Sequence, residues 1–136
     1  MNRMTKTLET KLEIKSWDEN PYRESDDGRK FTRAEVKLGP ADGIEEATFE
    51  ALMYYRPDGT SSYVSLMQIT ATLDGRSGSF VLQGTGAYDG TAATGESTVL
   101  PGSGTGELAG LTGTVTSSST HEDYPYMPIT LSYDLG

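Results

Sequence analysis

The sequence predicts an all-β protein, a single antiparallel β-barrel of about eight strands. Eight short segments alternate polar and apolar residues with a period of two, which is typical of half-buried strands. The 16 glycines and six prolines are spread along the 136 residues, between those segments, as turn residues are. The hydrophobic fraction of 35% suits a sheet whose every second side chain faces water. We expect residues 1–4 to form a flexible N-terminus and residues 5–136 to form the barrel domain.

The first expected strand alternates leucine, threonine and isoleucine with glutamate and lysine, and a polar stretch that contains Pro21 follows it. We predict this stretch, residues 17–28, to be a long connection. Residues 46–55 alternate like a strand and end at Arg56-Pro57-Asp58-Gly59, a turn sequence that argues against a helix. The expected strands cover residues 7–17, 31–38, 46–55, 61–73, 79–88, 91–100, 114–120 and 128–134.

Two hairpins predict which side chains point inward. A three-residue loop at residues 57–59 pairs Tyr55 with Ser61, and a four-residue loop is expected at residues 75–78. Both loops select the same face of residues 61–73, and a one-residue slip in either would reverse it. This face is the predicted interior and the predicted site for an apolar ligand. Its residues are Phe49, Met53, Tyr55, Tyr63, Met67, Ile69, Phe80 and Leu82.

A two-residue turn expected at Asp89-Gly90 extends the inner face through Ala93, Gly95 and Ser97, where small residues leave volume for a ligand. The outer face of the same strands carries Leu52, Val64 and Leu66 as well as polar residues. An exposed apolar patch indicates either a covering layer or a binding partner. A homo-oligomer is therefore one expectation.

Charge and composition exclude several functions. The formal net charge of −9 disfavours binding to nucleic acid or to an anionic membrane. The absence of cysteine excludes disulfides, thiol nucleophiles and thiolate metal sites. No stretch has the roughly 18 apolar residues of a membrane span, and no apolar segment follows the N-terminus as in a secretory signal. We expect a cytoplasmic protein without a cofactor or metal.

Several segments carry a family resemblance that covers about residues 5–134. They are Lys15-Ser16-Trp17-Asp18-Glu19, Pro21-Tyr22, Leu52-Met53-Tyr54-Tyr55, Asp58-Gly59-Thr60, the segment from Gly75 to Gln83, the glycine-rich segment from Pro101 to Gly113, and Leu131-Ser132-Tyr133-Asp134. The chain resembles a family of uncharacterised bacterial proteins with an allene oxide cyclase-like barrel, relatives of the plant cyclase and dirigent barrels. The resemblance implies the barrel fold and no assigned function. The family pattern has a glutamate at Met67 and a histidine at Gly84, so no catalytic residue is carried over.

Other motifs have simple structural explanations. The sequence Gly104-Thr105-Gly106-Glu107-Leu108-Ala109 matches a dinucleotide fingerprint, but Gly110 and Gly113 exclude the helix that this motif needs. His121, the single histidine, is expected in an exposed loop, because a metal site needs several ligands.

The charged and aromatic candidates leave alternatives open. The acidic residues Asp18, Glu19, Glu24, Asp26 and Asp27 could supply oxygen ligands for calcium, although a solvated charge run is favoured. Glu50 is expected on the outer face or at an interface, with an active-site role as the alternative. Five aromatic side chains could pack structurally or line a pocket. They are Trp17, Tyr54, Tyr55, Tyr63 and Tyr88.

Three function classes follow from these observations. The coherent apolar face favours a non-catalytic binder of a small apolar ligand in the lumen. An isomerase or cyclase is an alternative that depends on fold analogy alone. A structural or oligomeric protein that uses its outer apolar face is the third.

Overall fold

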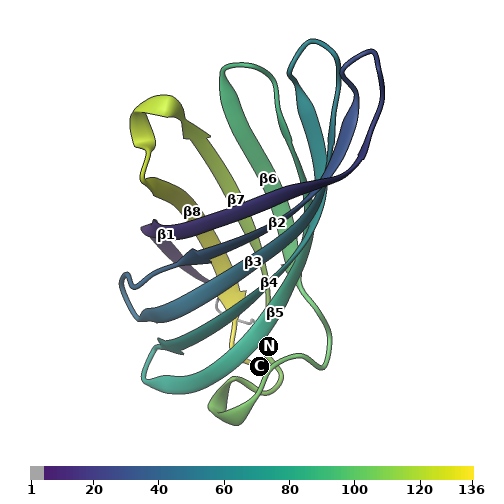
Figure 1. Cartoon of the computed structure of the whole chain (residues 1–136). Coiled ribbons are helices and arrows are strands. Elements are labelled where there is room, and N and C mark those ends of the chain that lie inside the picture. Colours follow the sequence, from purple (N-terminus) through teal and green to yellow (C-terminus); the bar gives the residue numbers. More distant parts are fainter. Residues whose placement is uncertain (1–4) are drawn as a thin grey trace.

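The computed structural model of the chain describes residues 5–136, which form eight strands and two short 3-10 helices (Figure 1). The expected flexible N-terminus, residues 1–4, lies outside the described residues. No helix within residues 5–136 is long and apolar enough to cross a membrane. The elements are β1 (Lys6–Glu24), β2 (Lys30–Leu38), β3 (Ile44–Tyr55), β4 (Ser61–Leu73), β5 (Arg76–Tyr88), β6 (Ala92–Val99), η1 (Gly106–Leu108), β7 (Thr112–Thr120), η2 (His121–Asp123) and β8 (Tyr126–Asp134).

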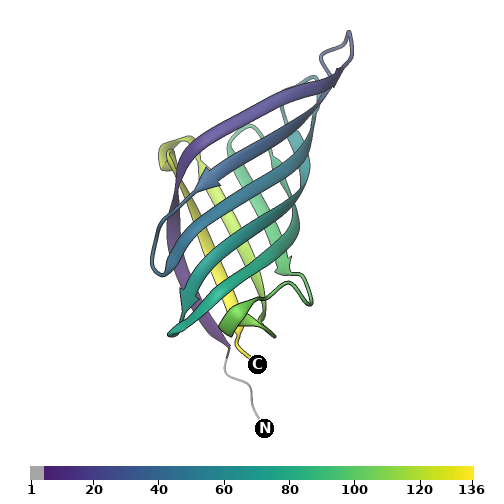
Figure 2. The same cartoon turned by 60° about the horizontal axis from the view of Figure 1, so that its bottom comes forward.

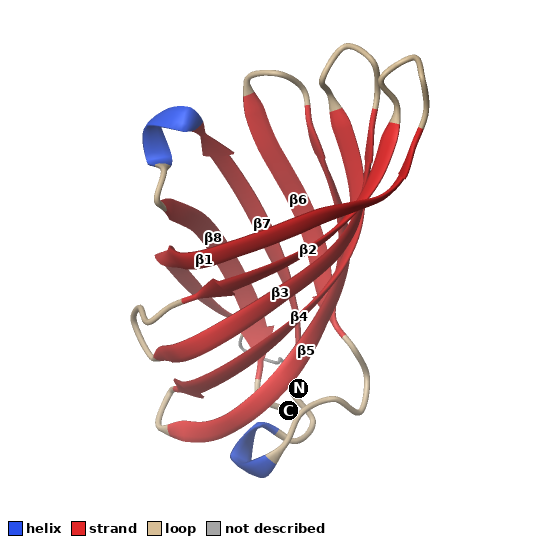
Figure 3. Cartoon of the chain, in the orientation of Figure 1, coloured by secondary structure: helices blue, strands red, loops and turns tan. Residues whose placement is uncertain are grey.

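The eight strands form one closed antiparallel sheet, as predicted. Each strand pairs with the next in the chain, and β8 pairs with β1. The strands wrap obliquely around the barrel (Figure 2). The two 3-10 helices lie at opposite ends (Figure 3). We call the end with η2 and the turns at residues 25–29, 56–60 and 89–91 the upper end, and the end with η1 the lower end.

β1 is longer than the sequence predicts. The polar stretch predicted as a connection continues the strand to Glu24, which pairs with Lys30 of β2. The chain then reverses within residues 25–29, where Gly28 has a φ of +94° and Ser25 N–H donates to the Arg29 carbonyl. The prediction of a long connection is therefore wrong, because a short hairpin replaces it.

One hairpin prediction is confirmed and another is wrong by two residues. Tyr55 pairs with Ser61, as expected from the loop at residues 57–59. The next turn contains only Asp74 and Gly75, whose φ angles of +54° and +81° suit a two-residue hairpin turn. The predicted four-residue loop at residues 75–78 does not form. Because the error is even, the same side chains still point inward.

The loop after β5 is also longer than expected. Tyr88 pairs with Ala93, so the connection runs through residues 89–91 up to the start of β6 at Ala92, instead of a two-residue turn at Asp89-Gly90. Gly86 pairs with Gly95 and Gly84 pairs with Ser97. The small residues therefore lie on the inner face, as predicted.

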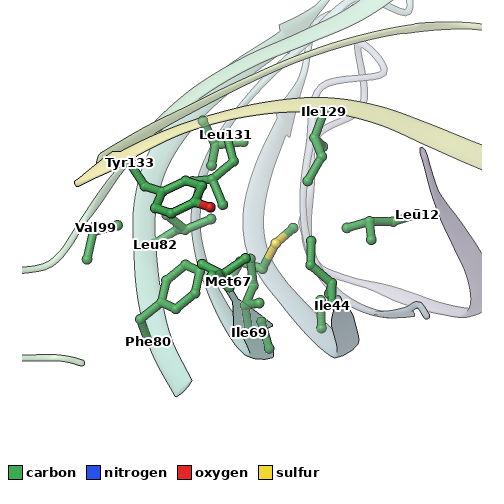
Figure 4. Close-up of a cluster of buried hydrophobic side chains, with 14 of the residues drawn as sticks. Leu12, Ile44, Met67, Ile69, Phe80, Leu82, Val99, Ile129, Leu131 and Tyr133 are labelled. Carbon is green, nitrogen blue, oxygen red and sulfur yellow. The ribbon is translucent and has the colours of Figure 1, made fainter. Parts of the chain in front are cut away.

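The lower half of the barrel is filled with apolar side chains (Figure 4). Ile69 and Phe80, which are cross-strand partners, are fully buried. Leu108 of η1 is also buried and caps the lower end. The largest buried side chains here are Phe80, Leu12, Ile44, Ile69, Leu82, Leu108 and Leu131.

The glycine-rich segment closes the lower end and makes no long helix, as expected. Thr105 N–H donates to the Ser79 carbonyl at 2.8 Å, and Ser79 N–H donates to Thr105 Oγ1 at 3.0 Å. Only the three-residue η1 follows Thr105. The fingerprint sequence is therefore a docking segment for β5.

The close approach of this segment to β5 requires a glycine at position 78. A Cβ there would lie 2.0 Å from the Thr105 carbonyl oxygen. We expect Gly78→Ala to lower the free energy of unfolding by about 2 kcal/mol, because the docked segment must move. Urea unfolding measures this loss. Thr85→Ala, on the exposed face of the same strand, is the control and should change the free energy by less than about 0.5 kcal/mol. Equal stability of the two variants would contradict the docking role.

Candidate functional site

The upper end of the barrel is incompletely closed by β1. The β1–β8 ladder runs from Lys6 to Glu13, and Ile14 N–H still donates to the Pro125 carbonyl. From Ile14 onward β1 pairs with β2. Figure 1 shows this half of β1 leading away from η2 across the upper end. On the inner face near this half of β1, the side chains of Glu19, Tyr55 and Tyr63 are only partly buried.

A β-bulge in β1 determines which of its side chains enter the barrel. Ile14 pairs with Leu38 and Ser16 pairs with Lys37, so Lys15 is an additional residue in β1. An extra residue reverses the alternation of the strand that follows. Glu19 consequently pairs with the buried Ala34 and points inward.

The Glu19 carboxylate receives three side-chain hydrogen bonds. Trp17 Nε1 donates to its Oε1 at 2.9 Å. Thr32 Oγ1 and the Tyr55 hydroxyl donate to its Oε2 at 2.7 Å and 2.5 Å. Thr32 is only 1% exposed, so Glu19 also satisfies a buried hydroxyl group. We call these four residues the Glu19 cluster.

The hydrogen bonds set the protonation states of the cluster. Partial burial raises the pKa of Glu19, but the hydrogen bonds from Tyr55, Thr32 and Trp17, with the nearby Lys30 ammonium, outweigh it and hold the pKa below 4.5. Burial and the bond to Glu19 raise the pKa of Tyr55 well above its ordinary 10.0. At neutral pH the site therefore contains a carboxylate and a neutral phenol. Lys30 Nζ lies 4.8 Å from the centre of the Tyr55 ring.

Tyr63 and Phe49 form the floor below the cluster. Their rings meet edge to face at 5.6 Å between centroids. A Cβ at Gly86 would lie 2.1 Å from the Tyr63 hydroxyl, and one at Gly95 would lie 2.5 Å from it. The Tyr63 ring thus extends from β4 along the inner wall, over its cross-strand partner Gly86 and over Gly95 of β6. Burial raises the pKa of Tyr63.

Little space remains below this floor. A cavity of about 40 Å³ lies there, between Tyr63, Met67, Leu82 and β6–β8. A water molecule needs about 10–15 Å³ of space for its centre, so this cavity can hold only a few waters. Apart from this cavity the lower lumen is packed, and the partly exposed Glu19 and Tyr55 lie above Tyr63.

The eight predicted site residues all lie on the inner face, but in two groups. Met67, Ile69, Phe80 and Leu82 belong to the lower core. Met53, Tyr55, Tyr63 and Phe49 surround the small upper cluster of Ala34 and Ala51. The structure thus assigns packing to the lower four residues and leaves the upper four beside Glu19.

The other sequence candidates lie apart from the Glu19 cluster. His121 is exposed in η2, where its Nε2 lies 3.0 Å from the Tyr88 hydroxyl. Glu50 is exposed on the outer face opposite Leu66, as predicted. Met67 and Gly84, the two positions that depart from the family pattern, lie on the inner face. Among residues 5–136 no three His, Asp or Glu side chains could hold a metal ion together.

The sequence pattern predicts Glu19 in a solvated acidic loop, and this prediction is wrong. The bulge at Lys15 leaves no signal in the pattern of polar and apolar residues. One signal was available, because Asp27-Gly28 is a strong hairpin sequence. A hairpin there would have extended β1 and paired Glu19 with the buried side of β2.

The lowered pKa of Glu19 makes a testable contribution to stability. Because the folded state holds this pKa below 4.5, the ionised carboxylate stabilises the fold above pH 4.5. The contribution is lost as the pH falls through the folded-state pKa. We expect Glu19→Gln to be less stable than the wild type at pH 7 and to lose less stability between pH 5 and pH 3. Urea unfolding across this range measures the difference. Glu35→Gln, an exposed carboxylate on β2, is the control, and identical curves for Glu19→Gln and the wild type would contradict the assignment.

Comparison with known proteins gives a family without an assigned activity. Residues 8–133 match the family described as "Protein of unknown function (DUF3224)". A crystal structure of a DUF3224 protein of unknown function from Shewanella oneidensis MR-1 is 26% identical, with a TM-score of 0.71, and covers 94% of this chain and 97% of that one. No curated protein matches the sequence. Neither match mentions allene oxide cyclase, so that part of the resemblance stays a prediction. With nearly all of its strands inside the matched region, the chain belongs to the DUF3224 family.

Proposed function

We propose that this protein is a non-catalytic binder of a small, mostly apolar ligand, held in the upper lumen with a polar group at Glu19. The observation that supports this most strongly is the Glu19 carboxylate, which faces the lumen beside Met53 and above Tyr63. A few fixed polar groups on a mainly apolar, concave surface are characteristic of small-molecule sites.

The packing below Tyr63 supports a ligand position in the upper half. The lower lumen holds a cavity of only about 40 Å³. In the upper half, the inner face of β5–β7 next to Tyr63 carries mostly glycine, alanine and serine, with Tyr88 near the end of β5. An apolar group of the ligand would lie against Met53, Tyr55 and Tyr63, and few side chains would have to move to admit it.

The carboxylate also defines the polar group of the ligand. Oε2 accepts from both Thr32 and Tyr55, whereas Oε1 accepts from Trp17. A carboxylate oxygen has about two acceptor positions. Oε1 can therefore accept one more hydrogen bond, so a hydroxyl or an amine fits and a carboxylate is repelled.

The protonation states favour binding over proton transfer. A general base works best with a pKa near the ambient pH, but hydrogen bonds hold the pKa of Glu19 below 4.5. The pKa of Tyr55 is raised, so its phenol is a poor acid at neutral pH. Both groups are suited to holding a partner. The isomerase or cyclase alternative gains no support from this pair.

Displacement of a neutral fluorescent dye tests the proposal. Nile red would be bound to the full chain and challenged with an alkyl amine, an alcohol and a fatty acid of equal chain length. We expect the amine and the alcohol to displace the dye at lower concentrations than the fatty acid. Glu19→Gln should reduce the preference for the amine about tenfold, because a charge-assisted bond of roughly 1.5 kcal/mol is lost.

Two controls make the result specific. Glu35→Gln removes the same charge from the outer face of β2 and should keep the preference of the wild type. Tyr55→Phe keeps the ring and removes one donor to Glu19, so it should weaken binding less than Glu19→Gln. Binding that no compound displaces, or a preference unchanged in Glu19→Gln, would refute the proposal.

A further inference from the structure

The outer face of β3 and β4 exposes three large apolar side chains. Leu52, Val64 and Leu66 are 50%, 55% and 50% exposed. They line an open depression of about 720 Å³ on the outside of the barrel, separate from the Glu19 cluster. Contiguous exposed apolar residues framed by polar ones are typical of a protein contact surface.

Strand register places these residues in two cross-strand rows. The Val64 row consists of Arg33, Leu52, Val64, Thr85 and Glu96, which are successive partners across β2–β6. Both charged ends line the same depression, four strands apart along this curved row. Val64 is at its midpoint, with a cation at one end and an anion at the other.

The neighbouring Leu66 row also has an apolar residue at its centre. It consists of Glu35, Glu50, Leu66, Gln83 and Thr98. Leu66 is the midpoint of this row, again on β4. The two apolar midpoints therefore lie side by side on the central strand, and polar residues end the rows on both sides.

We propose that this face binds a second copy of the same chain, related by a two-fold axis that runs along β4. Such an axis places Val64 against Val64 and Leu66 against Leu66 of the second copy. It also places Arg33 against Glu96 of the second copy, twice, by symmetry. An isologous contact requires this self-complementarity.

Charge supports a second copy as the occupant. Within residues 5–136 neither Arg33 nor Glu96 forms a salt bridge, so both are available to a partner. The net charge of −9 on each copy opposes association in general, so this contact depends on the local pairing of Arg33 with Glu96. Contact between the two copies would bury these exposed apolar side chains and exclude water from Val64 and Leu66.

Sedimentation of the full chain over a range of concentrations tests the proposal. We expect a monomer–dimer equilibrium in the wild type. Arg33→Glu alone brings two carboxylates together at each end of the interface, and Glu96→Arg alone brings two guanidinium groups together there. Each should weaken dimerisation at least tenfold. An equimolar mixture of the two variants should dimerise like the wild type, because both cross-interface pairs are then attractive.

Matched controls separate this contact from net charge. Lys11→Glu changes the charge as Arg33→Glu does, and Glu9→Arg changes it as Glu96→Arg does, but both are exposed on β1 away from the rows. They should dimerise like the wild type. A wild-type monomer at every concentration would overturn the proposal. A dimer that Arg33→Glu and Glu96→Arg leave intact, or a mixture that stays monomeric, would overturn the two-fold arrangement.

Discussion

A closed eight-stranded sheet encloses an interior of fixed width. The structure of this protein depends on which side chains fill that interior. In the lower half, branched and aromatic side chains from all sides meet and exclude water. In the upper half, β5 and β6 carry glycine, alanine and serine next to β4, so the Tyr63 ring can lie over them. Tyr63 divides the two regions because its ring lies against Gly86 and Gly95. This steric fit separates a packed core from an accessible mouth.

The Glu19 cluster shows how a partly buried carboxylate can satisfy a buried hydroxyl group. Thr32 is almost completely buried, and its hydroxyl needs an acceptor. Glu19 supplies that acceptor and is fixed in turn by Trp17 and Tyr55. A side chain held in this way is preorganised, so a ligand that binds to it has little side-chain entropy to remove. The same hydrogen bonds hold the pKa of Glu19 below its ordinary value.

The sequence predicts the strands and the inner face of the barrel well but misplaces Glu19 at its upper end. One physical reason explains both outcomes. Side-chain direction repeats every two residues. An error of an even number of residues in the position of a turn therefore leaves each side chain on its predicted face. The turn predicted at residues 75–78 was wrong by two positions, and Phe80 and Leu82 still point inward. The bulge at Lys15 is an odd change, so it reversed the direction of Glu19. Bulges arise from the fit between neighbouring strands, which a pattern along one strand does not contain.

The pairing of β1 with β8 has a consequence for how the chain folds. Lys6 pairs with Tyr133, so the ladder that completes the ring joins the first strand to the last. Such non-local pairing slows folding, because loop entropy is lost before the contacts form. During synthesis on the ribosome, the edges of β1 and β7 stay unpaired until the nine residues of β8 have been made. During that time these edges can pair with other chains. A circular permutant that links these adjacent ends would make the ladder a local hairpin and should fold faster than the natural order.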